Sequence, residues 1–197
     1  MSKNLEQRVA DLEKLVKELQ RKTATKISKK LGIGDMFELN GLNWTILDIT
    51  EKGYLCLADK YGKDVEFDSN SSKWTTSELR TKLNTDFLEK LEAEIGEGNI
   101  IPFERDLLSL DGQTEYGICE DMVSILTVDE YRKYRKLIPN QGYYWWLITP
   151  WSTPCNGYEK SVSVVCPSGD VSIRLCSIFA GVRPFCIFSS SIFESED

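Results

Sequence analysis

The sequence predicts an α+β fold: an N-terminal coiled-coil helix followed by a compact domain with an antiparallel sheet and two helical segments. Three observations support this prediction: a heptad repeat near the N-terminus, a group of strand patterns after it, and two helical patterns that separate this group from further strands. Strands and helices that are segregated along a chain are typical of α+β domains. We therefore divide the chain into a stalk and linker at residues 1–30 and a head domain at residues 31–197.

The clearest periodic pattern lies in residues 4–22. Apolar residues follow the 4-3-4 spacing of heptad positions a and d, with Val at a and Leu at d. A single helix of this kind exposes an apolar stripe, so we expect it to bind copies of itself as a dimer or trimer. The alternative is a helix folded back onto its own head. The predicted oligomerisation residues are Leu5, Val9, Leu12, Val16 and Leu19.

The head begins with strand patterns. Strands are predicted at residues 36–39 and 42–49, on either side of Asn40-Gly41, because both residues tolerate the positive φ of a tight hairpin. A third strand is predicted at residues 54–58, after a turn at residues 51–53.

The first helical segment is predicted near residues 75–95. Thr75 and Glu78 have the spacing of a capping box, and Gly96 is a plausible stop signal. Asn84 is a candidate break between two shorter helices. The predicted apolar face consists of Leu79, Leu83, Phe87, Leu91 and Ile95.

Residues 96–121 are predicted to be a long, mostly irregular connection. A short strand follows at residues 122–126, and a second capping box, Thr127 with Glu130, begins a helix that continues through Leu137. The remaining strands are predicted at residues 144–148, 161–166, 171–176 and 182–188, with a turn at residues 167–170.

The composition favours an acidic head on a basic stalk. Residues 1–30 contain nine Lys/Arg and four Asp/Glu, a net charge of +5, which leaves −12 for the rest of the stated −7. The acidic head argues against nucleic acid as the main ligand, because phosphate binding needs a positive surface. Neither a membrane-spanning run nor a signal peptide is present, so we expect synthesis in the cytoplasm and no membrane insertion.

Metal and cofactor chemistry have weak sequence support. The six cysteines form no C-x-x-C pair and the chain has no histidine, so we expect no zinc site and treat the cysteines as small buried side chains. Asp64, Glu66, Asp68 and Asn70 alternate like possible Ca²⁺ ligands, but the glycine and terminal Glu of an EF-hand are missing. A polar edge explains these four residues equally well, and we predict no metal and no cofactor.

Catalysis also has weak support. A nucleophile activated by histidine is excluded. Acid–base catalysis needs two carboxylates in contrasting environments, and nothing in the sequence pairs the candidates. Those candidates are Glu92, Glu94, Asp106, Asp111 and Glu115. We therefore do not predict an enzyme.

The last third of the chain is rich in aromatic residues. We expect Trp145 or Trp146 to be in the core, and Trp151 and Tyr158 to lie nearer the surface, where aromatic rings bind sugars or protein partners. Arg183 lies inside a strand pattern, and we expect it to pair with a buried acceptor.

Several ordered motifs resemble an uncharacterised domain family that is found in Firmicutes and in the phages that infect them. The most detailed is Trp74-x-x-Ser77-x-Leu79-Arg80-x-x-Leu83-Asn84-x-x-Phe87. The other matching blocks are Gly34-Asp35-x-Phe37, Trp44-x-Ile46-Leu47, Ile125-Leu126-x-x-x-Glu130, Trp145-Trp146-Leu147 and Gly181-Val182-Arg183-Pro184. Their order and spacing agree over residues 33–188, which is nearly the whole head.

The final two blocks also resemble the end of C-type-lectin-like domains, including the ligand-binding proteins that phages diversify. This resemblance implies a framework that displays loops near residues 151–160 and 170–179. It implies the ligand-binding residues Trp151, Asn156, Tyr158, Asp170, Arg174 and Phe179.

A coiled coil that leads into such a head looks like a phage fibre, decoration or baseplate component. We therefore predict a virion protein that binds copies of itself, other virion proteins and a host-surface glycan or protein. One alternative is a virion-associated cell-wall glycan hydrolase that uses Asp or Glu. Another is a host-encoded intracellular ligand-binding module.

Overall fold

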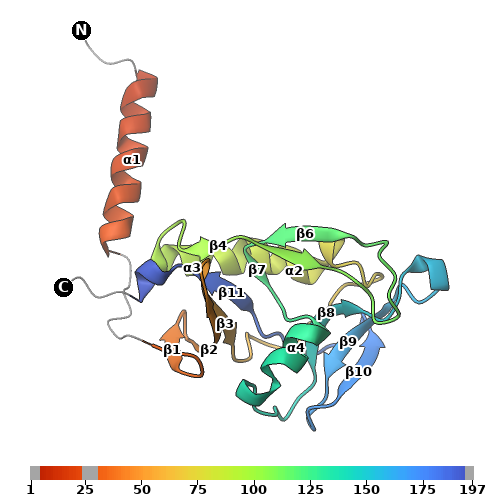
Figure 1. Ribbon diagram of the computed structural model, residues 1–197. Coiled ribbons are helices and arrows are strands. Elements are labelled where there is room, and N and C mark those ends of the chain that lie inside the picture. The colour runs from red at the N-terminus through yellow and green to blue at the C-terminus, as the bar shows by residue number, and fades with distance from the viewer. Residues whose placement is uncertain (1–4, 24–30, 194–197) are drawn as a thin grey trace.

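The computed structural model describes residues 5–23 and 31–193 of the chain (Figure 1). One long helix, α1 (Leu5–Thr23), precedes a domain that starts at Leu31, whose side chain is buried in the core. The domain contains three antiparallel sheets and few helices. The α+β class that the sequence predicts is therefore confirmed.

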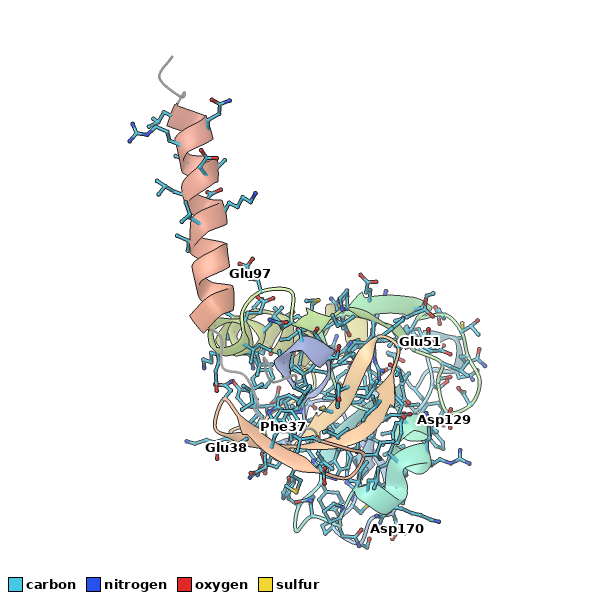
Figure 2. The ribbon with its side chains drawn as sticks, turned by 60° about the vertical axis from the view of Figure 1, so that its left-hand side comes forward. Phe37, Glu38, Glu51, Glu97, Asp129 and Asp170 are labelled. Atoms are coloured by element: carbon cyan, nitrogen blue, oxygen red, sulfur yellow. The ribbon has the colours of Figure 1, made fainter. Side chains whose placement is uncertain are left out.

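Helix α1 stands away from the domain in both views (Figures 1 and 2). Its described side chains, from Leu5 to Val16, are exposed. Leu5 is 72% exposed and Leu12 is 62% exposed, although both belong to the apolar stripe. The side chain of Leu19 lies outside the described part of the structure. The four described residues of the stripe are therefore open to solvent.

The large sheet has the strand order β1-β2-β3-β11-β4, and β7 pairs with the other part of β11. The predicted hairpin is confirmed, because Asn40 and Gly41 have φ values of 53° and 66° and join β1 to β2. The strands are β1 (Met36–Leu39), β2 (Leu42–Thr50), β3 (Gly53–Ala58), β4 (Ile100–Ile101), β7 (Val123–Ser124) and β11 (Phe185–Phe188).

Gly53 allows β3 to lie close to β11. Its φ is 140°, and a Cβ built at this position would lie 2.2 Å from the backbone oxygen of Phe188. A side chain here would push the two strands apart. The pairing of β3 with β11 therefore requires glycine at position 53.

The long helical segment consists of a 3₁₀ turn (Trp74–Thr76), α2 (Glu78–Lys82), a π-helical segment (Leu83–Phe87) and α3 (Leu88–Ile95). The predicted capping box at Thr75 is wrong, because Thr75 lies in the preceding turn and Ser77 is the N-cap residue. The Ser77 side chain accepts a hydrogen bond from the backbone N–H of Arg80. The predicted apolar face is confirmed, because all five of its residues are buried.

Asn84 distorts this segment without ending it. Its Nδ2 donates to the backbone oxygen of Val123 at 2.8 Å, and its Oδ1 accepts from the N–H groups of Met122 and Val123 at 3.2 and 3.0 Å. The widened π turn lets one side chain pair with the backbone beside β7. The predicted break is therefore a π-helical turn that attaches the helix to the sheet.

Residues 96–121 are mostly irregular, as predicted, but they also contain three short strands that were not predicted. These are β4, which pairs with β11, and the two strands β5 (Phe103–Asp106) and β6 (Ile118–Asp121), which pair with each other. Short strands of this kind are stabilised by partners distant in the sequence, so local patterns predict them poorly. The predicted strand at residues 122–126 is shortened to β7.

The second helical segment and the last strands match the prediction closely. Helix α4 (Val128–Tyr134) begins with the predicted capping box of Thr127 and Glu130 and continues as a 3₁₀ turn to Leu137. The second sheet has the order β10-β9-β8. Its strands are β8 (Trp145–Pro150), β9 (Ser161–Val165) and β10 (Val171–Leu175).

The large sheet is covered on both faces. Trp44, Cys56 and Phe188 join the helix of residues 78–95 in one apolar cluster. Leu47, Leu57 and Phe185 join α4 in a second cluster. Neighbouring residues of a strand point to opposite faces, which explains this division. The adjacent residues Trp145 and Trp146 are divided between the two clusters in the same way, and both are buried.

Asp121, at the end of β6, connects this strand to the start of the helical segment. Its two oxygens accept hydrogen bonds from Trp74 Nε1 and Arg80 Nε, each at 2.6 Å, and its side chain is buried. Trp74, Ser77, Arg80 and Asn84 are the polar residues of the most detailed family motif. Trp74, Arg80 and Asn84 bond to residues 121–123, and Ser77 caps the helix, so the motif is explained by the architecture of the domain.

Arg183 is buried, as the sequence predicts. Its Nε donates to the backbone oxygen of Ala58 at 2.9 Å, and its guanidinium lies 5.2 Å from the centre of the Trp145 ring. The expectation that all cysteines are buried is correct only for Cys56, Cys176 and Cys186. Cys155 is exposed because it lies in a surface loop.

Candidate binding tip

Two loops meet at the end of the domain that lies away from α1 (Figure 1). They are the β5–β6 loop, residues 107–117, and the β8–β9 loop, residues 151–160. We call these two loops the tip. The backbone N–H of Leu110 donates to the oxygen of Pro150 at 3.0 Å, so the first loop lies directly beside the start of the second.

The carboxylate of Asp111 joins the two loops. One of its oxygens accepts from Ser109 Oγ at 2.5 Å, within its own loop. The other accepts from Ser152 Oγ at 2.6 Å and Asn156 Nδ2 at 2.7 Å, both in the second loop. These hydrogen bonds, with that of Ser109 first, lower the pKa of Asp111 to about 2. The charged carboxylate therefore holds the tip together at neutral pH.

Further contacts make the tip more rigid. The exposed Cys155 thiol donates to Glu115 Oε2 at 3.2 Å, and this bond raises the pKa of Cys155. The backbone N–H of Ser72 donates to the oxygen of Glu159 at 2.6 Å, and its hydroxyl lies 3.2 Å from that of Tyr116. A third segment, before the long helix, is thus bound to both loops.

Three of the six predicted ligand-binding residues lie in the tip. Trp151 is 37% exposed and Tyr158 is 57% exposed, so the expectation that both aromatic rings are near the surface is confirmed. Asn156 donates to Asp111 and therefore also helps to build the tip. The loops hold these residues in place while two aromatic rings remain open to solvent.

The other three predicted residues do not lie in the tip. Arg174 donates to Ser172 Oγ and to the oxygen of Ile173, and its guanidinium lies 4.8 Å from the centre of the Tyr144 ring. Phe179 is exposed on the segment after β10. Asp170 lies beyond the opposite end of β10, below α4 in Figure 2.

The six residues are therefore not brought into one site. Adjacent β-strands are antiparallel, so the β9–β10 turn that contains Asp170 lies at the opposite end of the sheet from the β8–β9 loop.

A pocket of about 520 Å³ lies next to the tip, between residues 104–112 and the start of α4. This volume lies within the range of small-ligand sites, about 300–1,000 Å³. Leu108 and Leu110 line the pocket and are about 40% exposed, and Thr149 and Arg132 add polar groups. The lining of the pocket therefore combines polar and apolar groups.

The floor of the pocket contains an ion pair that was not predicted. Arg105 Nη1 and Nη2 donate to the two oxygens of Glu130 at 2.6 and 2.7 Å, and Nη2 also donates to the oxygen of Ile125. Burial favours a higher pKa for Glu130, but the Arg105 charge and its hydrogen bonds hold this pKa below its ordinary value. The alternation of residues 103–106 is the only sequence signal that Arg105 points inward.

Two of the four residues that alternate like possible Ca²⁺ ligands, Asp68 and Asp64, have other partners. Asp68 accepts from the backbone N–H groups of Asn70, Ser71 and Glu78, and Asp64 pairs with Lys60 at 2.6 Å. Among the described residues, no group of three or more Cys, Asp or Glu side chains could hold a metal ion. Within the same residues, no helix is long and apolar enough to cross a bilayer.

The carboxylate of Asp111 is not suited to act as a general acid at neutral pH. A general acid needs a carboxyl group whose pKa is raised toward neutrality, and Asp111 has the opposite shift. Glu92 has a raised pKa, caused by burial and by Glu97 and Glu89, but it lies on α3.

No model of a known protein family, no curated protein and no solved structure matches this chain.

Proposed function

We propose that this chain is an appendage protein of a bacteriophage particle, a fibre, decoration or baseplate component. In this proposal α1 forms a coiled coil, and the domain binds a host-surface or virion partner. The observation that carries the proposal is the open apolar stripe of α1, with Leu5, Leu12 and Val16 all at least half exposed. A helix with such a stripe gains stability by packing against another helix.

The domain provides the binding end of the proposed appendage. Trp151 and Tyr158 are exposed on loops held by Asp111, so they are ordered before a partner arrives. Ordered aromatic side chains lose little conformational entropy on binding. Such residues form contacts with sugar rings and protein surfaces. We place the binding surface at the tip and the adjacent pocket.

The phage setting and the C-type-lectin-like fold are part of the same proposal. Both depend on the motif resemblance over residues 33–188, and the exposed β8–β9 loop is consistent with a fold that displays loops near its C-terminus. Multiple copies on a particle raise the apparent affinity for a repeated surface ligand. Weak contacts at each tip would then be sufficient for host attachment.

The location is tested by purifying phage particles whose genome encodes this chain, labelling them with gold-conjugated antibodies against the domain, and viewing them by electron microscopy. The proposal predicts gold at one defined place on the particle. Protein found only in the soluble fraction would contradict it and would favour an intracellular binding module. Release of soluble fragments from purified host cell walls would favour the hydrolase instead.

Binding is tested by adding fluorescent full-length protein to cells of the host. We expect the double variant Trp151→Ala/Tyr158→Ala to bind at least about tenfold more weakly, as is typical when central aromatic anchors are removed. The matched control is Met36→Ala/Ile49→Ala, which removes exposed apolar side chains from the large sheet. Equal loss in both variants would contradict a binding surface at the tip.

A further inference from the structure

The charged residues beside the α1 stripe indicate whether two packed copies of α1 run in the same or in opposite directions. With Val9 and Val16 at heptad position a and Leu5 and Leu12 at position d, Arg8 occupies a g position and Glu13 the following e position. The side chains of Arg8 and Glu13 are both exposed. Residues at e and g border the seam between two helices and set their relative orientation.

We infer that α1 packs against α1 of a second copy of this chain, in the parallel direction and in register. This inference rests on the proposed function, because it takes the open stripe to be a self-association surface. It adds the direction and the register of the two helices.

Charge complementarity favours the parallel direction. In a parallel coiled coil, a g residue lies next to the e residue that is five positions later in the other helix. Arg8 of each copy therefore lies beside Glu13 of the other, which gives two attractive pairs in a dimer. Each of the five a and d residues packs against the same residue of the other copy, so every apolar layer is complete.

The antiparallel direction is disfavoured on both counts. In an antiparallel coiled coil, position a of one helix packs against position d of the other. In the first possible register, Val9 packs against Leu12 and Leu5 against Val16, and Leu19 has no apolar counterpart. In this register Glu6 borders Glu13. The other register pairs Leu12 with Val16 and Val9 with Leu19, and leaves Leu5 without a counterpart. It places Glu13 beside Glu13 and Arg8 beside Lys22, which are like charges.

Parallel helices place both domains at the same end of the coiled coil. Because each domain follows the C-terminal end of α1, two tips would be available to one surface at the same time. Two linked sites bind a repeated ligand more tightly than one site alone. An antiparallel pair would instead separate the domains by the length of the coil.

The first test changes the sign of the two charges in the full-length chain. In a parallel pair, Arg8→Glu places Glu beside Glu, so we expect the dissociation constant for self-association to rise about fivefold or more at low salt. Glu13→Arg should weaken association similarly, and the double variant Arg8→Glu/Glu13→Arg should restore it. Analytical ultracentrifugation measures all four proteins.

The second test uses a disulfide between copies. The background is Cys155→Ser, which removes the exposed native thiol. Leu5→Cys should form an interchain disulfide in a parallel pair, because residue 5 meets its counterpart. In the antiparallel registers the two copies of residue 5 are separated by about 11 residues or more, roughly 16 Å along the helix. The matched control is Gln7→Cys, at an outward-facing f position.

The results separate this inference from the proposed function. Weakening by Arg8→Glu, restoration in the double variant and cross-linking of Leu5→Cys would support the parallel pair. Tighter association of Arg8→Glu, or no cross-link in a chain that self-associates, would overturn the direction and leave the appendage proposal intact. A wild-type chain that remains monomeric at all concentrations would overturn both.

Discussion

Arg105 places a buried positive charge beside the partly buried carboxylate of Glu130, and the surrounding residues explain why this arrangement is stable. Both Nη groups of Arg105 meet carboxylate oxygens, and its guanidinium lies 5.0 and 5.5 Å from the ring centres of Phe103 and Phe185. A buried charge is costly unless it is paired and hydrogen-bonded. Removing one partner of the pair should therefore lower the stability of the domain strongly, because the other charge is left unpaired.

Replacing the carboxylate tests this point. We expect Glu130→Gln to lower the free energy of unfolding by about 3 kcal/mol, because it leaves the Arg105 charge buried without a counter-charge. Urea unfolding measures the change. The control is the neighbouring variant Asp129→Asn, whose ion pair with Arg132 is largely exposed and contributes less than about 1 kcal/mol. Similar losses in both variants would contradict a special role for the buried pair.

Asp111 gives the tip a dependence on pH. Its pKa in the folded chain is about 2, below the ordinary value of 3.8, so the charged form is favoured by folding. The stabilisation that it provides is complete above pH 4 and is lost as the pH falls from about 4 to 2.

The side-chain amide resonances of Asn156 should follow this titration in NMR spectra, with a midpoint near pH 2 in the wild-type chain. The variant Asp111→Asn should show no such transition, because an amide does not ionise. A wild-type midpoint near 3.8 would mean that the hydrogen bonds from Ser109, Ser152 and Asn156 do not hold the carboxylate.

At the scale of elements, the helix of residues 78–95 is connected to the sheet by polar contacts as well as by its apolar face. Asn84 makes three hydrogen bonds to the backbone of residues 122 and 123, at a place where β7 has only two residues. A strand this short has little stability of its own. The amide side chain of Asn84 therefore supplies hydrogen bonds that so short a strand does not obtain from its neighbour in the sheet.

Asn84→Leu should therefore lower the free energy of unfolding by about 1–3 kcal/mol, since it leaves backbone groups near β7 without partners. Chemical denaturation measures the loss, and hydrogen exchange should be faster for the amides of Met122 and Val123. The control Lys82→Ala changes an exposed residue two positions earlier in the same segment. A loss in the control as large as in Asn84→Leu would point to helix propensity instead.

The close approach of β3 and β11 gives a sharper prediction. Gly53→Ala places a methyl group 2.2 Å from the Phe188 oxygen, so the two central strands must separate. Gly41→Ala is the matched control, because its φ is also positive but nothing lies within 4 Å of the added Cβ. We expect the control to cost about 1–2 kcal/mol and Gly53→Ala clearly more, measured by thermal unfolding. Equal costs would mean that the strands adjust without loss.

Local signals account for the elements that could be predicted from the sequence. The Asn40-Gly41 hairpin, the Thr127–Glu130 capping box and the apolar face of the long helix each depend on residues close together in the chain. Strands β4 to β6 were missed because they pair over longer distances or face solvent on one side.

Long-range contacts also limit what the sequence predicts about the tip and the adjacent pocket. The exposure of Trp151 and Tyr158 follows from residue type, whereas the partners of Asp111 and Arg105 are known only once the chain has folded.

At the scale of the whole molecule, α1 and the domain are separate parts. The described side chains of α1 are exposed, and the domain has its own core from Leu31 to Phe193. Stability and self-association should therefore be separable by truncation.

We expect removal of residues 1–30 to abolish self-association and to change the melting temperature of the domain by less than about 4 °C, the shift that corresponds to roughly 1 kcal/mol in a domain of this size. Calorimetry and ultracentrifugation on the truncated and complete chains measure both quantities. A truncated chain that still self-associates would place the interface on the domain instead.

The position of β11 has a consequence for synthesis of the protein. This strand lies between β3 on one side and β4 and β7 on the other, yet it consists of residues 185–188. While the ribosome is still adding the earlier residues, at about 5–20 per second, the middle of the large sheet is absent. A nascent chain therefore presents unpaired edges of β3, β4 and β7 until residues 185–188 have been added. Premature termination anywhere before residue 185 would yield a product prone to aggregation and degradation.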